Sequence, residues 1–262
     1  MTKIGESWGP WRGCVKVSEA CRFCYAERQM DRYPNNFNFK VPKKAAKATF
    51  NAPLHESGRF RKPTLIFVCP WSDFFLREAD AWRDEAWGVI RTAKQHIFRI
   101  CTKRPDRIQS CLPSDWPKGG YPNVWLGVSV EQNRWVTRMD ELRKVDCALR
   151  WVSAEPVLEK LDLTAHLKGY SWLVSGGESG SADRIRHSDP DWFVFLRDQA
   201  RKARIPYLHL QNGGAGRDKH GAYGGRVLNG KIYNEFPPLP PTIPARRLLM
   251  HTRPHRRAKP KP

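Results

Sequence analysis

Long apolar segments are missing from this sequence of 262 residues. No apolar run approaches the roughly 20 residues that a helix needs to cross a bilayer. The first ten residues, MTKIGESWGP, lack the apolar core of a secretion signal, and the mean hydropathy is −0.64. These absences lead us to expect a cytoplasmic protein that does not contact a membrane.

The common nucleotide-binding fingerprints are also missing. The sequence contains neither a phosphate-binding loop nor the glycine pattern of dinucleotide-binding folds. Nucleoside triphosphate and NAD chemistry are therefore not expected.

Acidic residues are scarce relative to basic ones. The chain has 46 Lys and Arg against 26 Asp and Glu, a net charge of +20. Residues 245–262 hold seven basic residues and no acid, so 20 − 7 = +13 remains on the rest of the chain. Such a charge predicts a polyanionic partner, and nucleic acid is the commonest one.

Short apolar segments in the middle of the chain have the composition of buried strands. They are TLIFVC (64–69), HIFRIC (96–101), NVWLGVSV (123–130), LRWVS (149–153), SWLVS (171–175) and PYLHL (206–210). Helical periodicity lies between several of them, over residues 80–95, 131–145 and 190–204. The last of these helices is expected to begin with Asp189 as its cap and Pro190 in its first turn.

This alternation of strands and helices predicts an α/β fold with a parallel sheet. The number of units favours a full or partial TIM-like (β/α) barrel, and a doubly wound open sheet is the alternative. We expect one domain over residues 1–236, with a hairpin around Asn229-Gly230 near its end. Residues 237–262 are expected to be a Pro-rich linker followed by an irregular, disordered basic tail.

In either fold the chemistry gathers where parallel strands end. The segments that follow the predicted strands carry acids, bases and glycines: CPWSD (69–73), CTKRP (101–105), SVEQN (129–133), SAEP (153–156), GGESG (176–180) and QNGG (211–214). Each type of residue is also common in turns, but their recurrence at six strand ends indicates a functional site.

Three cysteines lie within eleven residues of GCVKVSEACRFCYAE (13–27), spaced C-x6-C-x2-C. Structural zinc would need a fourth ligand, such as Cys69, Cys101 or a histidine, whereas catalytic zinc needs only three. A [4Fe–4S] cluster held by three thiolates would keep one iron open. Unrelated buried cysteines are the remaining alternative. The chain has seven cysteines, an odd number, which argues against a fully paired disulfide set.

The motifs together resemble a known family. GCVKVSEACRFCYAER, followed in order by WSDFF, TKRP, NVWLGVSVE, AEP, GGESG and NEFP, is similar to a phage-associated three-cysteine-motif family of largely unknown function. Its members look like radical S-adenosylmethionine enzymes, and the WSD and TK segments resemble those of the spore photoproduct lyase branch, which repairs DNA. The resemblance covers nearly all of residues 7–237 and implies a phage- or prophage-encoded protein that acts in the host cytoplasm.

The resemblance implies two cofactors. Cys14, Cys21 and Cys24 would hold a [4Fe–4S] cluster, and its open iron would chelate S-adenosylmethionine. Reductive cleavage would then release a 5′-deoxyadenosyl radical that removes a hydrogen atom from the substrate. Phe23 matches the aromatic residue that such enzymes place against the adenine.

The resemblance also implies roles for the strand ends. Asp73 would meet the ammonium group of the methionine moiety, and Ser129 and Glu131 would contact ribose or carboxylate. The remaining assignments are Gly176, Gly177 and Glu178 at the adenine or substrate edge, Glu155 at the same mouth, and Lys103 with Arg104 on a carboxylate or phosphate. Cys101 and Lys103 are the candidate catalytic residues. Cys69 and Cys101 fall at strand ends, where a thiol could return a hydrogen atom to a substrate radical, and the alternative is that both are buried core cysteines.

Two features depart from the usual radical enzyme pattern. The first gap between cysteines is six residues rather than three, and GGES follows a later strand than Gly-Gly-Glu usually does. Of the roles that the resemblance implies, that of Glu178 is therefore the least directly supported.

Three interpretations stay open at this stage. One is a radical enzyme that modifies or repairs a nucleic acid or nucleotide, and another is a non-enzymatic nucleic-acid-binding protein stapled by zinc or a closed cluster. The third is an enzyme on a small acidic substrate, with the charge used for steering. A partner protein that supplies part of the site is compatible with each of them.

Overall fold

The computed structural model describes residues 4–31, 38–218, 221–245 and 248. Its strands are β1 (Glu6–Trp8), β2 (Trp11–Arg12), β3 (Lys43–Lys44), β4 (Leu65–Val68), β5 (Ile97–Thr102), β6 (Val124–Ser129), β7 (Leu149–Ala154), β8 (Trp172–Ser175), β9 (Tyr207–His209), β10 (Val227–Leu228) and β11 (Lys231–Ile232). Its α-helices are α1 (Tyr25–Met30), α2 (Lys47–Phe50), α3 (Asp80–Thr92), α4 (Thr137–Arg143) and α5 (Pro190–Lys202). Single turns of 3-10 helix lie in several connections: Glu19–Cys21, Ala52–Leu54, Gly58–Phe60, Arg77–Ala79, Pro105–Arg107, Gln109–Cys111, Asn133–Trp135, Thr164–His166 and Ala182–Arg184.

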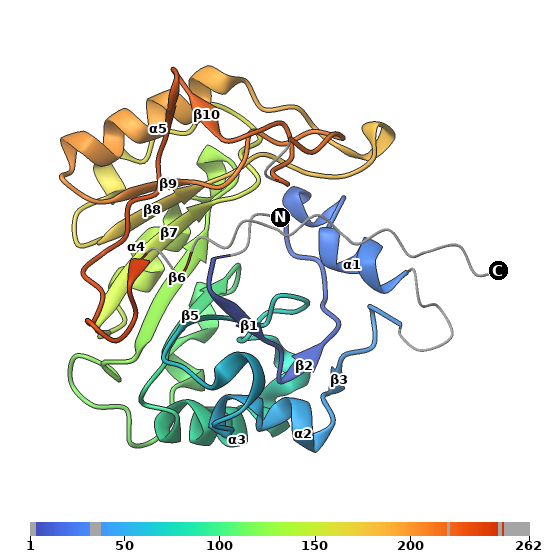
Figure 1. Cartoon of the computed structure of the whole chain (residues 1–262), viewed down its shortest axis with the longest axis vertical. Helices are drawn as coiled ribbons and strands as arrows, with labels where there is room; N and C mark the ends of the chain where they lie inside the picture. The colour runs from blue at the N-terminus through green and yellow to red at the C-terminus, as the bar shows by residue number, and fades with distance from the viewer. Residues whose placement is uncertain (1–3, 32–37, 219–220, 246–247, 249–262) are drawn as a thin grey trace.

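One seven-stranded parallel sheet forms the centre of the fold, in the order β1-β4-β5-β6-β7-β8-β9. The strands follow one another in space as they do along the chain, without the reversal that defines a doubly wound sheet. Figure 1 shows the curled sheet, with α3 near one end and α5 near the other. Among the described residues no pairing joins β1 to β9, so the sheet forms a half-barrel and the full barrel is not formed.

The sequence located the central strands and the longer helices correctly. All six predicted strands are present as β4 to β9, and the three predicted helices are present as α3, α4 and α5. The carboxylate of Asp189 accepts a hydrogen bond from the backbone N–H of Asp191 at 2.9 Å and caps α5 as expected. The predicted hairpin is β10–β11, with Asn229 and Gly230 at positive φ.

Two parts of the fold were not predicted. Strand β1 at the sheet edge and the β2–β3 ribbon are only two or three residues long, too short to show a period. The segment after Phe236 also packs on the domain, because Leu239, Ile243 and Leu248 join an apolar cluster on the sheet. The packed chain therefore extends beyond residue 236. Most of the predicted basic tail lies outside the described residues.

The sheet separates two apolar clusters. The larger lies between the sheet and the helices, with Trp87 of α3, Leu142 of α4 and Phe193 of α5 buried in it. The smaller lies on the opposite, inner face and includes Trp151 and Trp172. Strands buried on both faces are expected to be almost continuously apolar, as these are.

No helix in the described part of the chain is long and apolar enough to cross a membrane.

Gly127 on β6 makes room for a tryptophan of the neighbouring strand. A Cβ at Gly127 would lie 2.3 Å from Cε2 of the Trp151 ring, so the indole lies directly over the glycine. The Trp151 Nε1–H donates to the carbonyl of Trp125 at 3.3 Å, which holds the ring in this place.

We predict that Gly127→Ala lowers the free energy of unfolding by about 1–3 kcal/mol, because the new methyl group overpacks against Trp151. Urea denaturation followed by tryptophan fluorescence measures the change. The matched control is Gly88→Ala in α3, where nothing lies within 4 Å of the new Cβ and the helix should gain about 0.5–1 kcal/mol. Equal effects of the two substitutions would contradict the packing argument.

Candidate functional site

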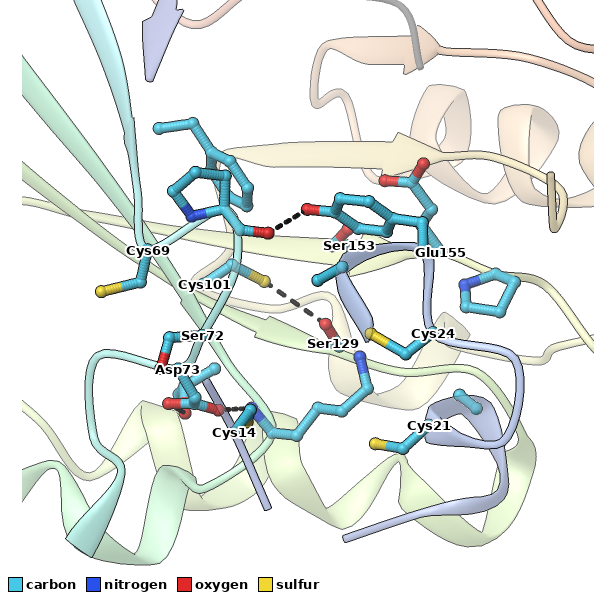
Figure 2. A pocket seen from close by; sticks show the side chains of 18 of the residues that line it. Cys14, Cys21, Cys24, Cys69, Ser72, Asp73, Cys101, Ser129, Ser153 and Glu155 are labelled. Atoms are coloured by element: carbon cyan, nitrogen blue, oxygen red, sulfur yellow. Dashed lines mark hydrogen bonds between the residues drawn. The ribbon is translucent and has the colours of Figure 1, made fainter. Parts of the chain in front are cut away.

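The three clustered cysteines line a cavity at the carboxyl ends of the parallel strands. The cavity has a volume of about 220 Å³ and is bounded on one side by the segment between β2 and α1. The opposite side consists of residues from the ends of β4 to β9. Figure 2 shows Cys21 and Cys24 facing the strand ends that carry Cys101 and Ser129, with Cys14 beside Asp73.

Hydrogen bonds from the end of β4 fix the start of the cysteine segment. The N–H of Gly13 donates to the carbonyl of Trp71 at 3.0 Å, and the hydroxyl of Ser72 donates to the carbonyl of Gly13 at 2.6 Å. The segment has little regular structure of its own, so these bonds set its position over the sheet.

Burial acts on the thiols themselves. It raises the pKa of Cys14 to about 12, assisted by the nearby charge of Asp73, and it raises the pKa of Cys24. Both side chains are therefore neutral thiols in the metal-free protein at neutral pH. All seven cysteines are free.

The cysteines do not form a preassembled site for a single ion. Within the described residues no three His, Cys, Asp or Glu side chains converge closely enough to hold one metal ion. Thiolates around one zinc ion, bound at about 2.3 Å, lie about 3.8 Å apart. In an iron–sulfur cluster each cysteine binds a different iron, so its ligands need not converge on a point. The arrangement is therefore compatible with a cluster.

Asp73 is buried and makes four hydrogen bonds within the chain. Its Oδ1 accepts from the Phe75 N–H at 2.9 Å and from the Thr102 hydroxyl at 2.7 Å. Its Oδ2 accepts from the Lys103 N–H and from Arg104, both at 3.0 Å. Contact with a cofactor ammonium, the role expected of Asp73, would require one of these bonds to be given up.

Arg104 links this carboxylate to the cysteine segment. The guanidinium pairs with Asp73, donates to the carbonyl of Val15 at 2.6 Å, and lies 3.9 Å from the sulfur of Cys14. Arg104, which was expected to bind a substrate anion, thus helps to position Cys14.

Glu131 is completely buried between two cations. Arg138 binds its Oε2 at 2.8 Å, and Nζ of Lys103 lies 2.8 Å from its Oε1. Burial lowers the pKa of Lys103, but the negative groups around it, with Glu131 first among them, together raise it by more, so the pKa lies above its usual value. Burial raises the pKa of Glu131, but the charges and hydrogen bonds of Lys103 and Arg138 together lower it by more. Both groups are charged at neutral pH.

Glu178 makes a bidentate ion pair with Arg186. The Nε and NH2 groups of Arg186 donate to the two carboxylate oxygens at 2.9 and 2.6 Å. The same guanidinium lies 5.3 Å from the centre of the Phe23 ring and donates to the carbonyl of Glu19 at 2.9 Å. Glu178 therefore supports the cysteine segment through Arg186.

The glycines beside Glu178 allow a close approach of two backbone segments. A Cβ at Gly177 would lie 2.0 Å from the carbonyl oxygen of Asn212, and the Gly177 N–H donates to the carbonyl of Gln211 at 2.9 Å. A Cβ at Gly176 would lie 3.2 Å from Oε1 of Glu155. Glu155 lines the cavity as expected, and burial raises its pKa.

The end of β5 brings a thiol and a hydroxyl together inside the cavity. The Cys101 sulfur lies 3.4 Å from the Ser129 hydroxyl, and burial raises the pKa of Cys101 to about 11. Ser153 lines the same wall. Cys69 also lines the cavity, and burial raises its pKa well above its usual value. The neutral thiols that hydrogen-atom return requires are present at both positions.

Arg99 and Gln211 are two cavity residues to which the sequence assigned no role. Both line the cavity, and each has a buried polar atom without a hydrogen-bond partner among the described residues. An arginine inside the apolar run HIFRIC was a visible signal for the first. Gln211 lies in a strand-end segment that the sequence did single out.

A comparison with protein families gives one match. The model of a family described as a protein of unknown function (DUF5131) matches residues 2–237. The chain belongs to this family. No curated protein and no solved structure matches the chain. The family description assigns no chemistry, so the phage association and the radical reaction stay predictions.

A buried histidine supports the strand end next to the glycines. His209 Nδ1 lies 2.9 Å from the Ser175 hydroxyl, and Nε2 lies 2.9 Å from Oδ1 of Asn212. Burial lowers the pKa of His209 to about 4 from an ordinary value of 6.5. Between these two pH values the unfolded chain binds a proton at this residue and the folded chain does not.

We predict that stability falls as the pH is lowered from about 6.5 to about 4, with His209 contributing about 3 kcal/mol to the loss. Urea titrations at several pH values measure it. In His209→Gln this part of the pH dependence should disappear, whatever the stability of the variant at pH 7. An unchanged pH dependence in that variant would assign the loss to other groups.

Proposed function

We propose that this protein is a radical S-adenosylmethionine enzyme that modifies or repairs a nucleic acid or nucleotide. The observation that carries the proposal is the position of the three cysteines. They line a cavity at the carboxyl ends of parallel strands, where the chemistry of barrel enzymes is located.

The charges around the cysteines suit an anionic cluster. Three thiolates on a [4Fe–4S]²⁺ core leave a net negative charge, and Arg104 and Lys103 lie on the sheet side of the cysteine segment. Cys14, Cys21 and Cys24 would hold the cluster, which together with S-adenosylmethionine supplies a 5′-deoxyadenosyl radical. The cysteine spacing and the order of the other motifs, which resemble such enzymes, support this assignment.

The chain's own residues would bind and orient the reactants. Phe23, half-buried beside Arg186, offers a ring for the adenine. Ser129 and Glu155 face the cavity and can donate or accept hydrogen bonds. Cys101 holds a proton on sulfur and can return a hydrogen atom to a substrate radical.

The net charge supports a polyanionic substrate. Seven of the twenty excess positive charges belong to residues 245–262, and thirteen belong to the rest of the chain. A phage-encoded protein acting on nucleic acid in the host cytoplasm is in keeping with this balance.

We predict that Cys14→Ala, Cys21→Ala and Cys24→Ala each abolish cluster binding and cleavage of S-adenosylmethionine, because three thiolates are needed. Anaerobic reconstitution with iron and sulfide counts, followed by electron paramagnetic resonance with and without S-adenosylmethionine, measures both. Cys147→Ala, a buried cysteine that does not line the cavity, is the matched control and should retain about four irons per chain.

The alternatives give different results in the same experiment. Uptake of zinc without iron would contradict the radical mechanism and favour a metal-stapled binding protein. A variant that loses metal, fold and nucleic-acid binding together would favour the same alternative.

We predict that binding to single-stranded and duplex DNA weakens steeply with salt, by roughly a thousandfold or more between 50 and 200 mM if about six phosphates are neutralised. Fluorescence anisotropy of labelled oligonucleotides measures the slope. A chain that ends at residue 248 lacks five basic residues of the tail and should give a shallower slope. A flat dependence in the full chain would instead favour a small acidic substrate.

A further inference from the structure

Arg99 points to a binding function that the cysteine site does not explain. It lies in the middle of β5, two residues before Cys101 and four before Lys103. At about 3.3 Å per residue, it lies roughly 13 Å along the strand from Lys103, deep in the half-barrel. Its side chain is only 6% exposed, yet it lines the cavity.

Aromatic rings surround the Arg99 guanidinium. The centres of the Phe67, Trp151 and Trp172 rings lie 5.0, 5.3 and 5.5 Å from its central carbon. The rings attract the cation and hold its orientation, but they do not accept the hydrogen bonds of its N–H groups in its plane. Gly127 contributes indirectly, because its missing side chain lets Trp151 lie over β6.

The Nε atom of Arg99 is buried without a hydrogen-bond partner, and no described carboxylate lies within ion-pair distance of the guanidinium. A buried charge and an unpaired buried donor both cost free energy unless a partner compensates them. Burial lowers the pKa of Arg99 to about 10, so it remains a cation at neutral pH.

Three acids around the cavity pair with cations of the chain. Asp73 pairs with Arg104, Glu131 with Lys103 and Arg138, and Glu178 with Arg186. Glu155, the carboxyl whose charge acts on Arg99, lines the same cavity, and burial raises its pKa, but it makes no ion pair with the guanidinium among the described residues. Among the described residues Arg99 therefore has no ion-pair partner in the half-barrel.

A second unpaired group opens on the same cavity. Gln211 is 1% exposed, and its Oε1 has no hydrogen-bond partner among the described residues, while its Nε2 donates to the carbonyl of Gly177 at 3.2 Å. Two residues that line the cavity thus each hold a buried polar atom without a partner among the described residues, a donor on Arg99 and an acceptor on Gln211. It has room for the end group of a ligand.

We propose that Arg99 binds a compact anionic group, a phosphate or a carboxylate, carried by the substrate. This inference rests on the proposed function for the identity of the substrate, but the anion site itself does not require the cluster. Arg99 presents a planar fork of N–H groups that matches both anions. Arg99 lies deeper in the half-barrel than the cysteine segment. The anion would therefore bind at the inner end of the cavity, and the reacting part of the substrate would lie nearer the cysteines.

The first test uses the full-length, metal-free protein labelled with ¹⁵N-arginine. The Nε–H resonance of Arg99 is assigned by its absence from the Arg99→Lys spectrum. Sodium phosphate and sodium acetate are then titrated separately at constant ionic strength. We expect a saturable shift of the Arg99 resonance with one or both anions, and the tighter anion identifies phosphate or carboxylate as the end group.

The second test measures affinity. Arg99→Gln should weaken binding of the preferred anion by about tenfold to a hundredfold, the value of hydrogen bonds to a charged group. Arg99→Lys keeps the charge but loses the fork and should lie between the wild type and Arg99→Gln. Arg134→Gln removes the same charge from an exposed residue outside the cavity and should bind as the wild type does.

Four outcomes would overturn the proposal. The Arg99 resonance does not shift with phosphate or acetate, or it shifts without saturation as the Arg134 resonance does. Alternatively, folded Arg99→Gln binds the anion as tightly as the wild type, which leaves Arg99 a packing role only. A saturable shift with S-adenosylmethionine but with neither anion would assign Arg99 to the cofactor. Because no iron is present, anion binding can succeed where cluster assembly fails, and the two proposals are judged separately.

Discussion

The ion pair between Asp73 and Arg104 is the interaction on which the site depends. Asp73 collects the ends of two neighbouring strands, and Arg104 extends from that carboxylate to the backbone of Val15 and the sulfur of Cys14. The segment with the three cysteines has almost no regular structure. Ordering it costs conformational entropy, and the contacts of Arg104 help to offset that cost. Removing either partner would leave a buried charge unpaired, a loss of about 3–5 kcal/mol, so the geometry of the cysteines and the stability of the strand ends are linked.

The sequence predicted the frame of this fold well because its strands are buried on both faces. Continuous apolar runs such as TLIFVC and NVWLGVSV can be recognised without knowing their neighbours. The closure of the sheet could not be predicted, because it depends on twist and on edge strands as short as β1. The sequence also located the polar strand ends, and most of them do line one cavity.

The sequence could not show which of these polar residues are free to bind a ligand. Asp73, Glu131 and Glu178 were each expected to contact the cofactor or substrate, but each is held by an arginine of the chain. The partners, Arg104, Arg138 and Arg186, lie 31, 7 and 8 residues away along the chain. Only the folded structure shows that they reach these carboxylates. The reverse holds for Arg99, since a lone arginine in an apolar strand is visible in the sequence, whereas the lack of an acid beside it is not.

The pairing of the acids explains why the interior of the half-barrel is suited to an anion. Each cation at the rim has a carboxylate, and those pairs are used to hold the loops, so they add little net charge to the cavity. Arg99 lies below them with aromatic rings in place of a counter-ion. Rings stabilise a guanidinium by about 0.5–2 kcal/mol each, which is less than the cost of burying its charge. The rings alone therefore do not compensate the buried charge of Arg99. An anion beside Arg99 would compensate this charge from within the cavity that the three cysteines also line.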